Sequence, residues 1–217
     1  MKSQDKFYED KSYKYFPGVA IIHFIQDKKI KKLLMQVVSE MKQSNLFDKY
    51  VFLPESSYHS TISDLLTYND LNRNTSFKTF PLKEELDESI IDSYVRDLLK
   101  NSKFNINVNM NITKITARKV RLEPATEEDR LILNNFRMKI ANLLNISFDI
   151  NYKFHISLGY QLEHRTDEER LKISEFLLYL NKFYLKSFTT LNIGICDLVV
   201  FNNMSEFINI DKGRFSK

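Results

Sequence analysis

The clearest pattern of apolar and polar positions is a strict alternation in residues 103–112. Phe104, Ile106, Val108 and Met110 fall on one face of this segment, and polar residues fall on the other. A period of two residues is typical of a half-buried strand in an antiparallel sheet. Other strands are predicted at residues 18–25, 58–66, about 115–123 and 150–160, with two short strands within 188–201.

Apolar residues at helical spacing predict the helices. Asp27 is expected to cap a helix that extends to about residue 46 and buries one apolar face. Residues 67–80 are polar without a clear period and predict a loop. Further helices are predicted at about 83–99, 126–145 and 166–185, and the last two begin with the capping-box patterns Thr126–Asp129 and Thr166–Glu169.

Two short motifs stand in equivalent places in this order of elements. His59-Ser60-Thr61 and His155-Ile156-Ser157 each lie in a predicted strand, and each half of the chain has the order helix, histidine strand, helix. This order predicts two related lobes that face each other within one compact domain. Because side chains alternate along a strand, the histidine and the hydroxyl residue of each motif share a face.

The composition excludes several classes of function. The chain has 217 residues with only four glycines and four prolines, all scattered, so no glycine-rich phosphate loop or dinucleotide fingerprint can form. The net charge of +4 favours a polyanionic ligand but is too small to indicate nucleic-acid binding. The single cysteine, Cys196, rules out an intrachain disulfide and is interpreted as a buried structural thiol.

The apolar segments are too short to cross a membrane, and the first residues lack the apolar core of a signal peptide. We therefore expect a soluble cytoplasmic protein. The lone cysteine fits a reducing compartment.

The two motifs predict acid–base chemistry on a phosphate diester. A neutral imidazole can take a proton from an attacking water, and an imidazolium can give one to the leaving oxygen. Thr61 and Ser157 can donate hydrogen bonds to non-bridging phosphate oxygens. A single histidine–x–hydroxyl triplet occurs by chance in many proteins, so the residues alone leave a structural interpretation open beside this one.

The paired motifs resemble the 2H phosphoesterase superfamily, which includes RNA 2′,3′-cyclic phosphodiesterases and 2′-5′ RNA ligase-like proteins. The resemblance is to a less characterised branch catalogued as a domain of unknown function. It covers roughly residues 16–208 and is carried by Phe16-Pro17-Gly18, Tyr58-His59-x-Thr61, Arg73 followed by Phe80-Pro81, Tyr152-x-Phe154-His155-x-Ser157-Leu158-x-Tyr160, and Phe201-x-x-Met204-x-x-Phe207. Three departures concern the substrate. Polar Ser60 stands where an apolar residue is usual, the glycine expected shortly after the first motif is missing, and Phe80 stands where the branch favours tryptophan.

The resemblance implies an α+β, bilobal fold with antiparallel sheets and flanking helices around a central cleft. We expect this domain to span residues 16–217, after a polar extension of residues 1–15. The catalytic residues would be His59 and His155, with Thr61 and Ser157 binding the substrate phosphate, and no metal or cofactor would be needed. The expected partner is a nucleotide or RNA with a cyclic or 2′-5′ phosphodiester, bound by a monomer.

Secondary candidates carry weaker predictions. Arg73 could clamp a phosphate, although a surface arginine is the plainer interpretation. Tyr160 could contact the substrate, but alternation places it on the core face with Leu158 unless Gly159 bends the strand. Tyr58 and Tyr152 are interpreted as packing or rim residues, Arg118 and Arg121 as solvent-facing unless they line the cleft, His23 as a core histidine and His164 as solvated.

Two other functions fit part of the pattern. A nucleotide- or RNA-end-binding module could use the same cleft without cleaving its ligand. A two-histidine metal enzyme fits poorly, because zinc needs three or four ligands and no carboxylate or cysteine stands at ligand spacing.

Overall fold

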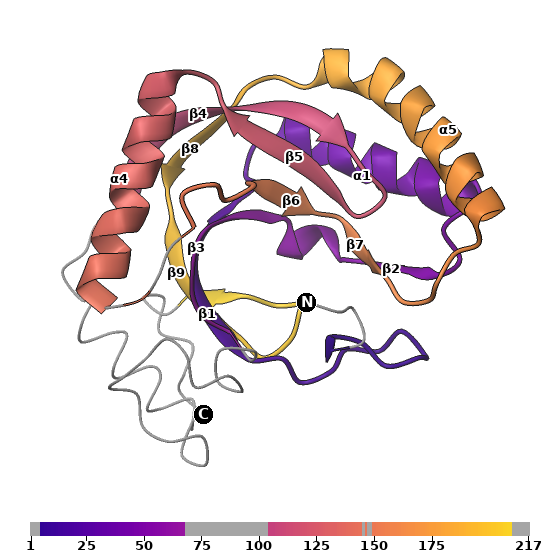
Figure 1. Ribbon diagram of the computed structural model, residues 1–217, viewed down its shortest axis with the longest axis horizontal. Helices are drawn as coiled ribbons and strands as arrows, with labels where there is room; N and C mark the ends of the chain where they lie inside the picture. Colours follow the sequence, from indigo (N-terminus) through magenta and orange to yellow (C-terminus); the bar gives the residue numbers. More distant parts are fainter. Residues whose placement is uncertain (1–4, 68–103, 145, 147–148, 210–217) are drawn as a thin grey trace.

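The computed structural model describes residues 5–67, 104–144, 146 and 149–209 (Figure 1). The predicted loop at 67–80 lies almost wholly outside the described residues. The predicted helix at 83–99, Arg73 and Phe80-Pro81 also lie outside them.

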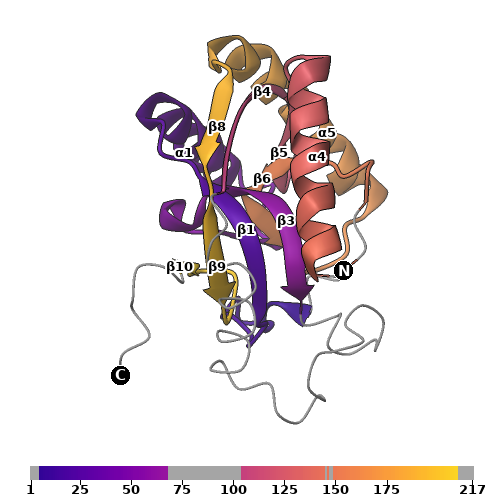
Figure 2. The same cartoon turned by 90° about the vertical axis from the view of Figure 1, so that its left-hand side faces the viewer.

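One antiparallel sheet of eight strands forms most of the molecule. Its two ends are close, because β8 and β9 stand near opposite ends of the strand order and yet are joined by Cys196 alone. The sheet is therefore strongly curled (Figures 1 and 2), and the predicted α+β class is confirmed. The order of strands is β10 (Ile208–Asn209), β9 (Asp197–Phe201), β1 (Gly18–Phe24), β3 (His59–Thr67), β6 (His155–Ser157), β5 (Lys119–Pro124), β4 (Asn105–Ile115) and β8 (Leu191–Ile195).

The two histidine strands meet in the middle of this sheet, where β3 pairs with β6. The two halves of the chain are thus joined edge to edge in one continuous sheet. This junction places residues nearly a hundred positions apart in the sequence on adjacent strands.

The strand predicted at 150–160 is divided in two. After β6 the chain leaves the large sheet at Leu158, and β7 (Gly159–Gln161) pairs with β2 (Tyr50–Phe52) in a separate two-stranded sheet. A Cβ at Gly159 would lie 2.4 Å from the Val51 carbonyl oxygen, so only glycine allows this close approach.

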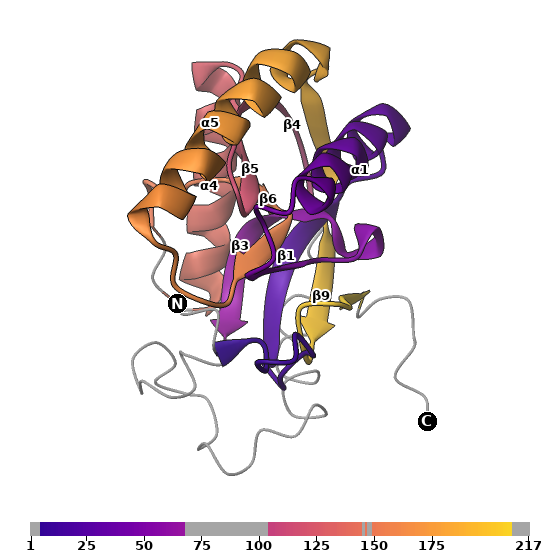
Figure 3. The ribbon, with the colours of Figure 1, turned by 90° about the vertical axis from the view of Figure 1, so that its right-hand side faces the viewer.

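Three α-helices are described: α1 (Lys28–Gln43), α4 (Glu127–Leu144) and α5 (Asp167–Tyr184). The Asp27 side chain caps α1, and Thr166 with Glu169 forms the expected capping box of α5. Helices α1 and α5 lie next to each other on one side of the molecule (Figure 3), linked by a hydrogen bond from the Tyr184 hydroxyl to Glu40. Helix α4 lies on the other side (Figure 1). None of the described helices combines the length and apolar character needed to cross a membrane.

The N-terminal residues 5–15, expected in a polar extension, pack against the domain. Phe7 is only 2% exposed, and its ring centroid lies 5.2 Å from that of Tyr160. Phe7 and Tyr13 form a β-bridge, and the Phe16 amide donates to the Asn202 carbonyl at 2.7 Å. These contacts fasten the first described residues to the rest of the domain.

Candidate active site

The four residues of the two histidine motifs form a square on one face of the sheet. Ser60 pairs with Ile156 in the antiparallel β3–β6 ladder. This register places His59 opposite Ser157 and Thr61 opposite His155. The two imidazoles therefore lie on one diagonal and the two hydroxyls on the other, and all four line the same pocket of about 340 Å³.

Each imidazole is held by its own backbone in the same way. Nδ1 of His59 lies 2.7 Å from the Ser57 carbonyl oxygen, and Nδ1 of His155 lies 2.7 Å from the Lys153 carbonyl oxygen. A carbonyl oxygen can only accept a hydrogen bond, so each Nδ1 carries the proton. Nε2 is then the atom that gains or loses a proton on both rings, and it is available to a ligand in the pocket.

The surroundings of both histidines favour the neutral imidazole. Burial lowers the pKa of His59 to about 4, with the charges of His155 and Lys6 acting in the same direction and the Ser57 carbonyl opposing them. Burial also lowers the pKa of His155, and the positive charges of Lys119 and Lys6 lower it further. The Phe207 ring, 4.3 Å from the His59 ring, covers one side of that imidazole. Near neutral pH both histidines are thus neutral in the free protein.

A β-bulge in β3 adds Asp64 to the pocket. Ile22 pairs with Thr61 and Ile21 pairs with Ser63, so Ile62 is an extra residue in β3. The extra residue reverses the alternation, and Asp64 lines the pocket together with Thr61. Strict alternation misses Asp64, because it places Ser63 on that face.

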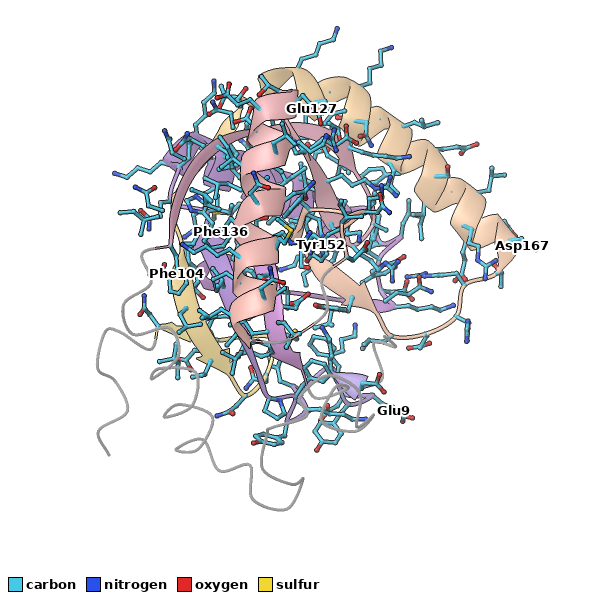
Figure 4. The ribbon with its side chains drawn as sticks, turned by 60° about the vertical axis from the view of Figure 1, so that its left-hand side comes forward. Glu9, Phe104, Glu127, Phe136, Tyr152 and Asp167 are labelled. Atoms are coloured by element: carbon cyan, nitrogen blue, oxygen red, sulfur yellow. The ribbon has the colours of Figure 1, made fainter. Side chains whose placement is uncertain are left out.

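Tyr152 lies beside α4 at the centre of the molecule (Figure 4) and also lines the pocket. Burial and the nearby Asp64 raise the pKa of its hydroxyl. The Arg137 guanidinium of α4 stacks on the Tyr152 ring at 4.7 Å and donates to the Asp149 carbonyl at 2.7 Å. The sequence predicts a packing or rim residue at this position, and in the structure Tyr152 packs against Arg137 and lines the pocket.

Tyr160 reaches the pocket because the strand breaks at Leu158. Its hydroxyl accepts a hydrogen bond from the Lys6 ammonium at 3.1 Å. The break in the strand that this position requires is present, because the chain passes at Leu158 from β6 in the large sheet to β7 in the small one. Lys6 itself lines the pocket, and the sequence does not single it out, because nothing distinguishes it from the other lysines of the first residues.

The turn between β4 and β5 supplies further positive charge. Arg118 and Lys119 line the pocket, whereas Arg121, which pairs with His155 in the register, is not among the lining residues. Burial and the neighbouring Arg118 and Arg121 lower the pKa of Lys119. Among the described lining residues, three cationic side chains accompany the single carboxylate of Asp64, so the pocket suits an anion.

The two remaining histidines do not line this pocket. His23 is half-buried, with Nδ1 3.0 Å from the Ile195 carbonyl oxygen, and His164 is exposed. Cys196 is a buried thiol. Within the described part of the chain, no three His, Cys, Asp or Glu side chains are grouped so as to hold a metal ion.

Comparison with solved structures gives a close match in fold. A conserved protein of unknown function, ATU0111 from Agrobacterium tumefaciens str. C58, superimposes with a TM-score of 0.84 at 19% identity, covering 94% of this chain and 88% of that one. The protein TT0787 of Thermus thermophilus matches with a TM-score of 0.42 at 13% identity, covering 84% of this chain and 87% of that one. No curated protein matches this chain.

A protein-family model matches residues 6–121, more than half of the chain. The matched segment includes Lys6, the first histidine motif and the basic turn. The resemblance to the 2H phosphoesterase superfamily is confirmed by this match. The chain belongs to the family described as 2H-phosphodiest, a domain of unknown function (DUF1868).

Proposed function

We propose that this protein is a metal-independent phosphodiesterase that uses His59 and His155 as its acid–base pair. Its substrate would be a 2′,3′-cyclic phosphate or a 2′-5′-linked nucleotide or oligonucleotide. The observation that carries the proposal is the square of two imidazoles and two hydroxyls, in which both Nε2 atoms are left for one pocket.

The square suits an in-line displacement at phosphorus. The attacking and leaving oxygens lie on opposite sides of the phosphorus atom, and residues on the diagonal of a strand pair are roughly 7–8 Å apart, somewhat less at Cβ. One Nε2 takes a proton from water as the water oxygen bonds to phosphorus. The other Nε2 gives its proton to the leaving oxygen as that P–O bond breaks. Thr61 and Ser157 donate hydrogen bonds to the two non-bridging oxygens.

Either imidazole can serve as the base in hydrolysis, because burial lowers the pKa of both and leaves both Nε2 atoms free of a proton before the substrate binds. The other imidazole then acts as the acid. It gains its proton when the phosphate anion enters, because a negative charge beside an imidazole raises its pKa.

The pocket also fits a nucleoside. Aromatic side chains line it, among them Phe16, Phe201 and Phe207. Nucleobases stack on such rings without requiring a particular base. The basic turn at Arg118 and Lys119 suits the phosphate end of the same ligand.

The test is a turnover screen in excess chelator, using 2′,3′-cyclic mononucleotides, 2′-5′ oligonucleotides and cyclic dinucleotides. Wild-type protein should release product from at least one class, and His59→Ala and His155→Ala proteins should not. Calorimetry with nucleoside monophosphates runs beside it. Binding without product from any class would replace the enzyme with a nucleotide-binding module, and a strict need for a divalent metal would contradict the mechanism.

A further inference from the structure

Lys6 places a positive charge inside the pocket from the N-terminal segment. The residue is 8% exposed, and its ammonium lies 4.7 Å from the ring centroids of both Phe16 and Tyr160. Nζ also donates hydrogen bonds to the Tyr160 hydroxyl at 3.1 Å and to the Met204 sulfur at 3.2 Å. These four contacts fix the ammonium at the pocket wall.

This charge has no anionic partner in the part of the chain that the structure describes. The groups around Nζ are a phenol, a thioether and two aromatic faces. A buried ammonium is costly unless an anion pairs with it, and a thioether is a weak acceptor. An ammonium has three N–H donors, so at least one is left for a ligand in the pocket.

The ammonium acts on both histidines. Its charge lowers the pKa of His59 and also that of His155. A cation that affects both His59 and His155 lies near the space between them. The phosphate would bind in this space.

We infer that Lys6 binds a non-bridging oxygen of the substrate phosphate and balances the negative charge that builds up there during the displacement. This inference rests on the proposed function and extends it, because it gives the N-terminal segment a direct part in the site. Thr61 and Ser157 supply neutral donors, whereas Lys6 supplies the charge. In the free protein the same charge adds to the effect of burial, which lowers the pKa of both imidazoles.

The test measures anion binding first, because binding requires no turnover. The probe is inorganic phosphate, added to wild-type, Lys6→Met, Lys6→Arg and Lys14→Met proteins while the histidine resonances are followed by NMR. Lys14 is the matched control: it lies on the same segment and stacks on Tyr8 at 5.0 Å, but it does not line this pocket. Methionine keeps most of the length of lysine among the aromatic rings, and circular dichroism checks the fold.

We expect Lys6→Met to weaken phosphate binding roughly 10- to 100-fold, which is the range for a hydrogen bond to a charged group. Lys6→Arg should retain most of the affinity, and Lys14→Met should match wild type. The same titrations should show the pKa of His59 and of His155 raised in Lys6→Met, since a positive charge has been removed. If Lys6→Met does not fold, Lys6→Gln takes its place in the comparison.

Phosphate affinity in Lys6→Met within twofold of wild type would overturn the inference. So would equal losses in Lys6→Met and Lys6→Arg, which would indicate a packing role, or a wild-type protein that binds no phosphate. The failure of the inference and the failure of the proposed function can be told apart. Phosphate binding that depends on Lys6 without any turnover would remove the function and leave only the contact between Lys6 and phosphate. Turnover with unchanged kcat and KM in Lys6→Met would support the proposed function and contradict the inference about Lys6.

Discussion

Thr61 lies directly across the β3–β6 pair from His155, so the hydroxyl of one motif neighbours the imidazole of the other. The same register sets His59 across from Ser157. Each half of the chain therefore supplies one imidazole and one hydroxyl, and each imidazole neighbours the hydroxyl of the other half. Loss of the β3–β6 pairing would separate His59 from Ser157 and Thr61 from His155 at once.

Replacing either pocket histidine should abolish most of the activity. His59→Ala and His155→Ala should each lower kcat about 10²- to 10⁴-fold, which is the usual contribution of one acid–base group. The exposed His164 provides the control, and His164→Ala should behave as wild type. Steady-state rates on the substrate found in the screen give the measurement. Wild-type turnover in either pocket variant would contradict the acid–base assignment.

The hydroxyls should contribute to the transition state more than to binding. Ser157→Ala and Thr61→Val each remove one donor to phosphate, and kcat should fall by up to about 10²–10³ while KM changes little. Thr61→Ser keeps the donor and should keep most of the activity. A change confined to KM would show that the hydroxyls bind the ground state and transition state alike.

Ser60 stands between His59 and Thr61 but points to the other face of the sheet. Its side chain is fully buried, and its hydroxyl has no hydrogen-bond partner among the described residues. A buried hydroxyl without a partner costs free energy, so Ser60→Ala should leave activity unchanged and raise the free energy of unfolding by about 1 kcal/mol. Urea denaturation measures the change. A loss of stability would show that the hydroxyl is satisfied in solution.

The lowered pKa of His59 predicts how stability depends on pH. Unfolded His59 titrates near 6.5 and folded His59 near 4, so between these values the unfolded state binds a proton that the folded state does not. The free energy of unfolding must therefore fall as the pH falls through this window, on the order of 1–3 kcal/mol for this residue. Urea denaturation at pH 7, 6 and 5 should show a steeper decline for wild type than for His59→Asn. Parallel declines would mean that folding leaves the pKa of His59 unchanged.

Local sequence patterns predict most of the described elements, and they select the four residues of the two motifs, because these depend on neighbours in the chain. The Asp27 cap of α1 and the capping box of α5 are examples, since each is a contact within one turn. The alternation within each motif likewise puts His155 and Ser157 on one face.

The rest of the site depends on contacts that no local pattern records. Asp64 enters the pocket through a bulge that exists only in the pairing of β3 with β1. Lys6 is in a segment whose polar composition suggests an extension, yet two aromatic residues, Phe7 within it and Phe16 at its end, anchor it to the core. The pairing of β3 with β6 depends on the order of all the strands in the sheet, so no local pattern in either strand predicts it.

Gly159 provides a test of how the strand break builds the pocket. A Cβ at this position would meet the Val51 carbonyl oxygen at 2.4 Å, and backbone cannot yield as a side chain can. Gly159→Ala should therefore weaken the β2–β7 pairing, with a loss of about 1–3 kcal/mol in the free energy of unfolding. Because Tyr160 follows directly, the variant should also disturb the Tyr160–Lys6 contact and weaken phosphate binding.

Gly194→Ala is the matched control. The nearest atom to its added Cβ is the Asn192 side-chain oxygen at 3.6 Å, an ordinary contact, so stability and phosphate affinity should stay close to wild type. Denaturation and phosphate titration of the two variants side by side separate the steric effect at Gly159 from the general effect of replacing glycine in a strand. Equal stability of the two variants would mean that β2 and β7 can move apart at little cost, and that Tyr160 does not need the close approach at Gly159 to reach the pocket.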